Sequence, residues 1–208
     1  MPRRPDMPPF SERDLLADPF DLFAAWYELA REETPLAEAM CLATVDEDGM
    51  PDARMVLLKG FGADGFRFFT NHDSAKGGQL AARPAAALVL YWRELDRQVR
   101  VRGVVERLGD AASDEYFASR PRESRIGAWA SPQSQPLAGR EALERRVAEA
   151  EERFGDGEVP RPEHWGGYLV VPERIEFWQG QVGRLHDRFV YRRLPDSGEP
   201  WSVRRLGP

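Results

Sequence analysis

The sequence predicts a mainly β protein with attached helices (α+β), and two patterns carry that prediction. Apolar or alternating segments recur between turns that contain glycine, as expected of strands. They cover residues 39–45, 51–59, 66–70, 85–92, 98–108, 168–171, 173–178, 185–193 and 201–206. The turn Asp46-Glu-Asp-Gly49 joins the first two as a hairpin. Successive antiparallel strands favour a β-barrel with helices outside it over a parallel sheet.

Four segments carry helix signals. Asp18-Pro19 is typical of an N-cap and first helical residue, and aromatic residues follow at helical spacing over 19–32. A second helix is expected from Ser74 to about Arg83, and others over 110–120 and 140–154. Residues 126–137 are expected to form a loop. Residues 1–17, rich in proline and charge, are expected to be mobile, and 18–208 to form a single domain.

Composition limits the classes of function. No apolar run reaches the roughly 20 residues of a membrane span, and no signal core follows the first residues. Cys41 is the only cysteine, so no internal disulfide or zinc pattern is possible, and a cytoplasmic location is expected. No metal site is predicted. The net charge of −6 argues against a nucleic-acid partner.

Lysine is rare in this chain. Of 29 Lys and Arg residues only Lys59 and Lys76 are lysines, which indicates either chance survival or a need for compact point charges. Lys76 follows Ser74 at the start of a predicted helix. A hydroxyl, a lysine and a helix N-terminus together can bind an anion, although ordinary capping explains the serine equally well.

Two further groups of polar residues invite a functional interpretation. On a strand, Arg184, His186 and Arg188 would share one face, where they could hold an anion or simply blunt a solvated edge. Tyr116, Arg120 and Ser124 could bind a phosphate or form a surface network. No dinucleotide fingerprint, P-loop or nucleophile elbow occurs, so a phosphate-bearing ligand would be held outside the common nucleotide folds.

The motifs then resemble those of the pyridoxine (pyridoxamine) 5′-phosphate oxidase family. They are Arg54-Met-Val-Leu-Leu-Lys59, Phe69-Thr70-Asn, Ser74-Ala-Lys76, Gln98, the stretch from Tyr116-Phe-x-Ser-Arg120 through Ser124 to Trp129, Gln133-Ser134, Glu176-Phe-Trp178 and Arg184-Leu-His-Asp-Arg188. The similarity runs from about residue 14 to the C-terminus. The resemblance implies an FMN-binding split β-barrel that forms a homodimer with the flavin at the interface.

The resemblance also implies the roles of individual residues. Positions matching flavin contacts are Arg54, Met55, Val56, Leu57, Leu58, Lys59, Phe69, Thr70, Lys76, Gln98, Gln133, Ser134, Trp178 and Arg188. Positions matching substrate contacts are Lys59, Tyr116, Arg120, Ser124, Arg184, Leu185 and His186. Arg184 and His186 are the implied catalytic residues. Both lysines fall within these sets, which argues against chance survival.

The implied reaction oxidises pyridoxamine 5′-phosphate or pyridoxine 5′-phosphate to pyridoxal 5′-phosphate. Hydride passes from C4′ of the substrate to flavin N5, and O2 is reduced to H2O2. Two departures stand out: Ala75 replaces the family's usual arginine, and no tyrosine follows Arg3 and Arg4. The alternatives are a related flavin oxidase for another ring substrate, such as a phenazine precursor, and a flavin- or pyridoxal-phosphate-binding protein without turnover.

Overall fold

The computed structural model describes residues 8–194 and 200–208, and its framework is one curled sheet of nine strands. The strands are β1 (Ala39–Val45), β2 (Pro51–Leu57), β3 (Gly60–Gly62), β4 (Gly65–Asn71), β5 (Ala85–Trp92), β6 (Arg97–Arg107), β7 (Trp165–Gln179), β8 (Asp187–Arg193) and β9 (Trp201–Arg205). Every pairing is antiparallel, in the order β2-β1-β5-β6-β7-β4-β3, with β8 and β9 continuing from β7.

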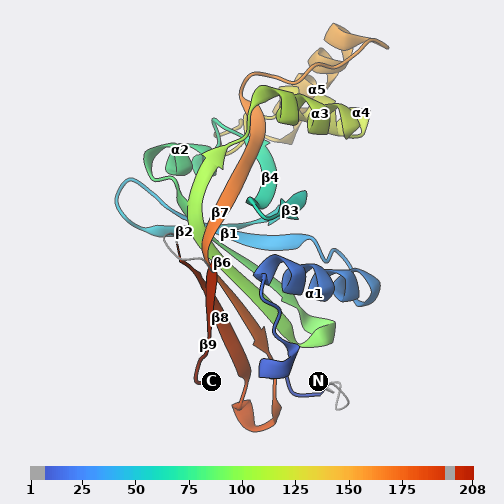
Figure 1. Ribbon diagram of the computed structural model, residues 1–208. Coiled ribbons are helices and arrows are strands. Elements are labelled where there is room, and N and C mark those ends of the chain that lie inside the picture. Colours follow the sequence, from blue (N-terminus) through green and yellow to red (C-terminus); the bar gives the residue numbers. More distant parts are fainter. Residues whose placement is uncertain (1–7, 195–199) are drawn as a thin grey trace.

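The described residues also form five α-helices: α1 (Pro19–Glu33), α2 (Ala75–Ala82), α3 (Asp110–Ser119), α4 (Arg122–Ala130) and α5 (Arg140–Phe154). In Figure 1, α3, α4 and α5 cluster at one end of the molecule, while β8, β9 and both labelled termini lie toward the other. The Asp18 side chain accepts a hydrogen bond from Phe20 N at 2.8 Å, which confirms the predicted N-cap of α1. The sequence prediction of a mainly β fold with attached helices is therefore confirmed.

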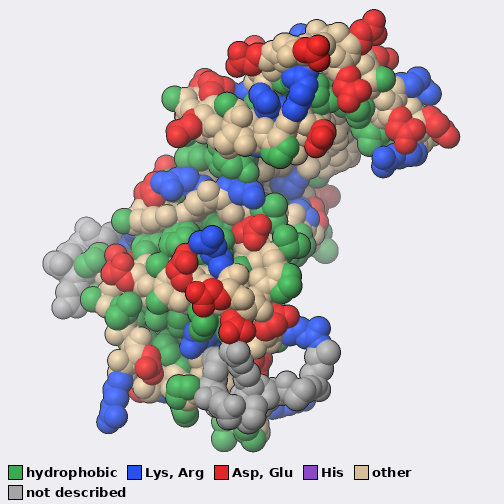
Figure 2. All heavy atoms as spheres, turned by 90° about the vertical axis from the view of Figure 1, so that its right-hand side faces the viewer, with side chains coloured by type: hydrophobic (Ala, Val, Ile, Leu, Met, Phe, Trp, Pro, Cys, Tyr) green, Lys and Arg blue, Asp and Glu red, His purple; other side chains and the backbone are tan. Residues whose placement is uncertain are grey.

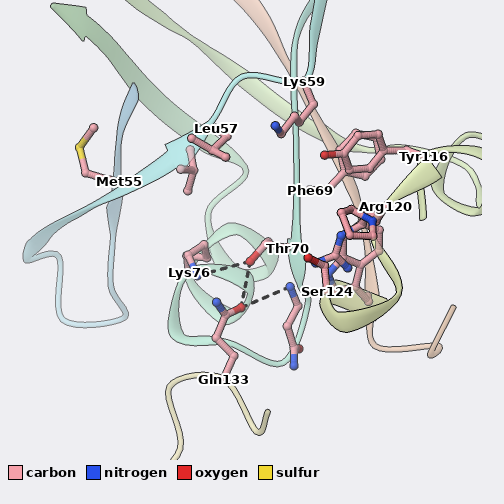
Figure 3. A pocket seen from close by; sticks show the side chains of 14 residues that line it. Met55, Leu57, Lys59, Phe69, Thr70, Lys76, Tyr116, Arg120, Ser124 and Gln133 are labelled. Atoms are coloured by element: carbon pink, nitrogen blue, oxygen red, sulfur yellow. Dashed lines mark hydrogen bonds between the residues drawn. The ribbon is translucent and has the colours of Figure 1, made fainter. Parts of the chain in front are cut away.

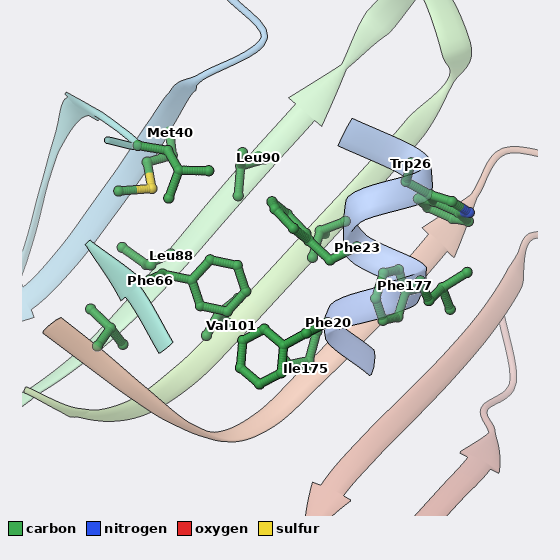
Figure 4. Close-up of a cluster of buried hydrophobic side chains, with 14 of the residues drawn as sticks. Phe20, Phe23, Trp26, Met40, Phe66, Leu88, Leu90, Val101, Ile175 and Phe177 are labelled. Atoms are coloured by element: carbon green, nitrogen blue, oxygen red, sulfur yellow. The ribbon is translucent and has the colours of Figure 1, made fainter. Parts of the chain in front are cut away.

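The main core lies between α1 and the inner face of the barrel. Phe23, Met40, Phe66, Leu90 and Phe177 are all 0% exposed within it. Figure 4 shows the aromatic residues of α1 pointing at side chains of the surrounding strands. Edge-to-face contacts such as Phe23 to Phe66, 4.9 Å between centroids, fix the helix on the sheet.

The described part of the N-terminal segment packs against the body of the protein. Phe10 is 3% exposed and packs edge to face on Trp26 and Phe189. Its amide donates to Asp187 Oδ2 at 3.1 Å, and Arg205 bridges Glu12 and Asp187. A single buried aromatic residue is enough to anchor such a segment, which composition alone does not reveal. Residues 1–7, including Arg3 and Arg4, lie outside the described residues.

Three predicted elements differ in the structure. The expected loop over 126–137 begins as helix α4, because Ile126 and Ala130 are one turn apart and both bury against the small core under α5. The two strands predicted over 168–178 are one continuous strand, β7, which passes through Pro172 at a register shift. The strand predicted from 185 begins at Asp187 instead.

No helix among the described residues is long and apolar enough to cross a bilayer. Acidic and basic side chains are interspersed over the helical end of the molecule in Figure 2, as expected for the charged helix α5. Among the described residues no group of three or more His, Cys, Asp or Glu side chains is placed to hold a metal ion.

Candidate active site

A cavity of about 430 Å³ opens between the barrel and helices α2, α3 and α4. It is lined by Met55, Val56, Leu57, Lys59, Phe69, Thr70, Asn71, Lys76, Tyr116, Arg120, Pro121, Ser124, Gln133 and Trp165. Both lysines of the chain line it. Four separate stretches that sequence reasoning singled out, 55–59, 69–76, 116–124 and 133, therefore meet in one place (Figure 3).

One end of the cavity is built around Lys76. Its side chain is 7% exposed, and its Nζ lies 3.4 Å from Thr70 Oγ1 and 3.5 Å from Ser74 Oγ. Burial and the nearby Arg54 lower the pKa of Lys76. Within the described residues the Lys76 ammonium has no carboxylate partner in an ion pair. A buried cation without a counter-ion is costly, so this end fits an anionic group.

The start of α2 adds backbone donors beside Lys76. Ser74 Oγ accepts from Gly77 N at 3.3 Å, so the capping interpretation of Ser74 is confirmed. Gly77 cannot carry a side chain, because a Cβ there would lie 2.0 Å from the His72 carbonyl oxygen. The preceding turn is thus held tightly against the helix N-terminus, whose dipole also favours an anion.

Gln133, 63 residues further along the sequence than Thr70, also lies at this end of the cavity. Its Oε1 accepts from Thr70 Oγ1 at 3.0 Å and from Asn71 N at 3.4 Å. These bonds tie the segment after α4 to the end of β4, as the dashed lines in Figure 3 show. The neighbouring Ser134 is exposed, has a φ of +70° and does not line the cavity.

The other end combines cations with a stack of aromatic rings. Phe69 stacks on Tyr116 at 4.0 Å between centroids and on Trp165 at 5.6 Å. The Arg120 guanidinium lies 4.6 Å over the Trp165 ring, so that its charge is held in a partly dry wall. Lys59 and Ser124 complete this end (Figure 3).

Arg120 carries the clearest sign of a role in ligand binding. Its Nη1 is buried and has no hydrogen-bond partner within the described residues. Burial lowers the pKa of Arg120, and burial raises the pKa of the adjacent Tyr116 phenol. A guanidinium stripped of water with a free N–H is suited to a multiply charged oxyanion. The predicted Tyr116, Arg120 and Ser124 set does come together at this cavity.

A second group of predicted residues lies elsewhere, on β6, β7 and β8. Gln98 and Arg188 flank Trp178 as its direct cross-strand neighbours. Arg188 donates to Glu176 Oε1 at 2.7 Å, and the 2%-exposed Glu176 also contacts Arg100 and Arg174. Glu176 therefore fixes the Arg188 side chain beside Trp178.

The predicted alternation of Arg184, His186 and Arg188 on one strand face is wrong. Val182–Arg184 forms a 3₁₀ turn, and Arg184 has a left-handed φ of +63°. Strand pairing begins only at Asp187, because the glycine-rich stretch before it bends away from β7. His186 still reaches this group: its ring lies 4.6 Å from Trp178, and its Nδ1 accepts from Gln181 N at 3.1 Å. Arg184 and Leu185 are exposed.

The two groups are far apart within one chain. Trp165 lines the cavity at the start of β7, and Trp178 lies near the end of the same strand. Thirteen residues at about 3.3 Å each separate them by roughly 40 Å along the strand. Arg184, His186 and Arg188 do not line the cavity of their own chain.

Two more predicted residues do not line the cavity. Arg54 hydrogen bonds to Thr44, Asp52 and Gln79 behind Lys76, so its guanidinium is already engaged. Leu58 is 4% exposed and belongs to the main core. Strand β2 ends at Leu57, so the strand predicted over 51–59 stops before Lys59.

Sequence reasoning did not single out Trp165, and it gave no role to Asn71 and Glu176, although both lie within the matched motifs. The pair Gly166-Gly167 that follows Trp165 carries a signal for close packing. A Cβ at Gly167 would lie 2.7 Å from Phe69 Cε1, so only glycine lets the aromatic wall close. Nothing in the local sequence indicates that Glu176 gathers three arginines.

The fold and this cavity define a class of protein, the split β-barrel oxidoreductases. Residues 28–154 match the family described as pyridoxamine 5′-phosphate oxidase. Residues 165–208 match the pyridoxine 5′-phosphate oxidase C-terminal dimerisation region. The chain belongs to the pyridoxamine 5′-phosphate oxidase family, and it is an enzyme of that oxidoreductase class.

Individual relatives agree with this assignment. The pyridoxine/pyridoxamine 5′-phosphate oxidase of Caulobacter vibrioides is 57% identical over 92% of this chain and 85% of its own. The corresponding enzyme of Cupriavidus metallidurans is 52% identical over 95% of this chain and 92% of its own. PhzG from Burkholderia lata, solved with tetrahydrophenazine-1-carboxylic acid, superposes with a TM-score of 0.88 at 30% identity over 98% of both chains. The resemblance seen in the sequence is thereby confirmed.

Proposed function

We propose that this protein is an FMN-dependent oxidase that converts pyridoxamine 5′-phosphate or pyridoxine 5′-phosphate to pyridoxal 5′-phosphate, with O2 as acceptor and H2O2 as product. The observation that carries the proposal is one cavity with two cationic ends, Lys76 at one and Lys59 with Arg120 at the other. Two separate ends fit two phosphate-bearing ligands, a flavin mononucleotide and a phosphorylated ring substrate.

The residues present fit both ligands. Lys76, Thr70 and the N-terminus of α2 would hold the flavin phosphate, since Lys76 is buried without a carboxylate partner in the described residues. Lys59, Tyr116, Arg120 and Ser124 would hold the substrate phosphate, where the Arg120 Nη1 atom has an unused hydrogen. Arg54 would support the Lys76 end electrostatically, through its engaged position behind it.

The active enzyme is proposed to be a homodimer with the flavin at the interface. The residues that would reach the cavity of a second copy are Gln98, Trp178, Arg184, His186 and Arg188, because none of them lines the cavity of its own chain. The matched C-terminal dimerisation region supports this arrangement. An enzyme with a single cysteine and no disulfide would suit the reducing cytoplasm.

Bound flavin would supply the two-electron acceptor that no amino-acid side chain provides. The protein's own contribution is positioning and charge. Phosphate contacts at Lys59 and Arg120 would fix the substrate at one end. Arg184 would hold the ring and stabilise negative charge on its substituents. His186, oriented by Trp178 and by the Gln181 amide, would contact the same ring and hold a proton beside it.

A second candidate is oxidation of a phenazine precursor, which the superposition on PhzG favours. The cationic set Lys59, Tyr116, Arg120 and Ser124 argues for a phosphorylated substrate instead, because a substrate without phosphate would leave the buried Arg120 unpaired. A non-catalytic binding protein would not need Arg184 and His186 beside a second copy's cavity.

The deciding experiment is an aerobic assay of the FMN-supplemented protein with pyridoxamine 5′-phosphate and pyridoxine 5′-phosphate. The aldehyde product and H2O2 would be followed together, with unphosphorylated pyridoxamine as control. Equimolar aldehyde and peroxide from the phosphorylated substrates alone is the expected result. A flavin-loaded protein that forms neither product would rule out the B6 reaction and direct the same assay to reduced phenazine carboxylates.

A further inference from the structure

A second cavity, of about 480 Å³, lies on the outer face of β6, β7 and β8. It is lined by Arg102, Glu173, Arg174, Arg192 and Arg193, and we call it the arginine groove. Four guanidiniums face a single lining carboxylate, in a protein whose net charge is −6. None of these residues belongs to the cavity described above.

The arginines of the groove form a row across three strands. Arg102 lies directly opposite Arg174, and Arg174 directly opposite Arg192. Neighbours of this kind are about 5 Å apart, and like charges placed so destabilise a sheet. Within the described residues only Arg174 of the three has a carboxylate partner, Glu176 at 2.6 Å, which it shares with Arg100 and Arg188. The row therefore concentrates positive charge on an exposed surface, which suits an external anion.

An acidic turn of matching charge lies at the other side of the sheet. The β1–β2 turn, Asp46-Glu-Asp-Gly49, projects from the body of the molecule in Figure 1. Asp46 Oδ1 accepts from Met50 N at 2.8 Å, which fixes the turn. Glu47 and Asp48 are exposed, and neither side chain has a partner among residues 8–194 and 200–208. β2 and β8 are five strand positions apart, roughly 24 Å, so the turn does not meet its own groove.

The strand registers place the two features opposite each other in a dimer. Trp178 lies opposite Gln98, and Gln98 opposite Tyr91. Extended by two residues beyond the pair Cys41 and Val89, the register of β5 with β1 sets Tyr91 level with Ala39, which lies opposite Leu57. Trp178 and the cavity residue Leu57 thus share one cross-strand row. In the proposed dimer, a two-fold axis parallel to the strands and level with β5 would bring Trp178 of one copy over Leu57 of the other.

The same axis also aligns the row of arginines. Four residues before Trp178 comes Arg174, and four residues before Leu57 comes Ala53. β2 and β7 run in the same direction, because three strands separate them in an antiparallel sheet. In that arrangement Arg174 and Arg102 would lie over Ala53 and Ala43, three to four residues from the acidic turn, and Arg192 would lie just beyond the edge strand β2. Alanines at this level leave room for arginine side chains to lie across the hairpin.

We propose that the arginine groove of each subunit binds the acidic β1–β2 turn of the second copy of this chain. The proposal rests on the proposed dimer and adds to it a pair of charge-complementary contacts, repeated twice by symmetry. These contacts set the alignment of the two sheets, and with it the distance between Trp178 of one subunit and the flavin cavity of the other.

A charge exchange tests the proposal. One double variant, Arg102→Glu/Arg192→Glu, reverses the charge of two arginines of the groove. The other, Glu47→Arg/Asp48→Arg, reverses the charge of two acidic residues of the turn. Each homodimer is expected to dissociate roughly tenfold more readily in sedimentation at 0.1 M salt, because two contacts per dimer become repulsive. Arg145→Glu on the exposed face of α5 is the matched control and should dimerise like wild type. Circular dichroism and the melting temperature establish that each variant folds.

The decisive measurement is on the mixture of the two reversed variants. Native mass spectrometry is expected to show the mixed dimer in excess over both homodimers, since the two reversed surfaces are again complementary. A mixed dimer no more abundant than chance, or reversed homodimers as tight as wild type, would overturn the proposal while leaving the dimer itself intact. A wild-type chain that stays monomeric would instead refute the proposed active dimer. If the groove variant does not fold, the turn variant alone decides, because it changes only exposed turn residues.

Discussion

Replacing Arg120 by alanine is the most direct test of the substrate end of the cavity. The guanidinium is held over Trp165 at 4.6 Å, and its buried Nη1 has no partner within the described residues. The rings of Trp165 and Phe117 therefore offset part of the cost of burying this guanidinium. A dianionic phosphate would gain a charge-assisted hydrogen bond, worth about 1.5–3 kcal/mol.

That energy converts to a rise in KM of roughly tenfold to a hundredfold, at about 1.4 kcal/mol per factor of ten. The turnover number should change little, because the contact is made equally in the ground and transition states. FMN affinity, measured by quenching of flavin fluorescence, should stay as in wild type. Loss of the cation–π contact should lower the stability by about 1 kcal/mol.

Two variants sharpen the result. Arg120→Lys keeps the charge but not the planar fork, and should recover only part of the affinity. Arg145→Ala removes an exposed arginine of α5 and should leave KM unchanged. A flavin-loaded Arg120→Ala protein with a wild-type KM would remove Arg120 from the phosphate site and refute the two-ended interpretation of the cavity.

Four further predictions follow from the structure. Arg184→Ala should lose most turnover yet retain FMN, and wild-type kinetics in the loaded variant would end its catalytic role. Ala75→Arg should tighten FMN binding about tenfold, with riboflavin affinity unchanged, because the added cation stands beside Lys76 at the start of α2. Gly103→Ala should lower the free energy of unfolding by about 2 kcal/mol or more, because the new Cβ would lie 1.9 Å from a carbonyl oxygen of β7. Gly78→Ala, whose Cβ would meet open space, should stabilise α2 instead. Calorimetry of the two variants measures both changes in stability. Burial lowers the pKa of His72 to about 4 from 6.5, so the unfolded chain binds its proton first as the pH falls. Stability should therefore drop between about pH 6.5 and 4, and a His72→Gln variant should show a shallower pH dependence in denaturant titrations.

Much of the local structure could be predicted from the residues themselves. The Asp18 cap, the Asp46–Gly49 hairpin and the Ser74 cap are short-range features, in which a side chain and a backbone group a few residues apart determine the conformation. The family motifs identified the stretches around Lys59, Lys76 and Arg120 before any geometry was known.

Other features depended on contacts between distant parts of the chain. Helix α4 forms where its own residues favour a loop, because Ile126 and Ala130 have a core to cover. Phe10 is ordered because Trp26 and Phe189 surround it. The sequence also placed Arg184 and Arg188 on one strand face, whereas the bend before Asp187 separates them.

The sequence by itself determined the family, the strands and the identity of the cationic residues, because these depend on residue type and short-range pattern. Only the tertiary structure decided which of those residues line the cavity and which lie on the sheet face around Trp178. Lys59, Lys76 and Arg120 meet in one cavity, while Trp178 and Arg188 lie on a distant face. The physical reason is that β7 carries Trp165 at its first residue and Trp178 next to its last, so strand pairing fixes the two groups at opposite ends.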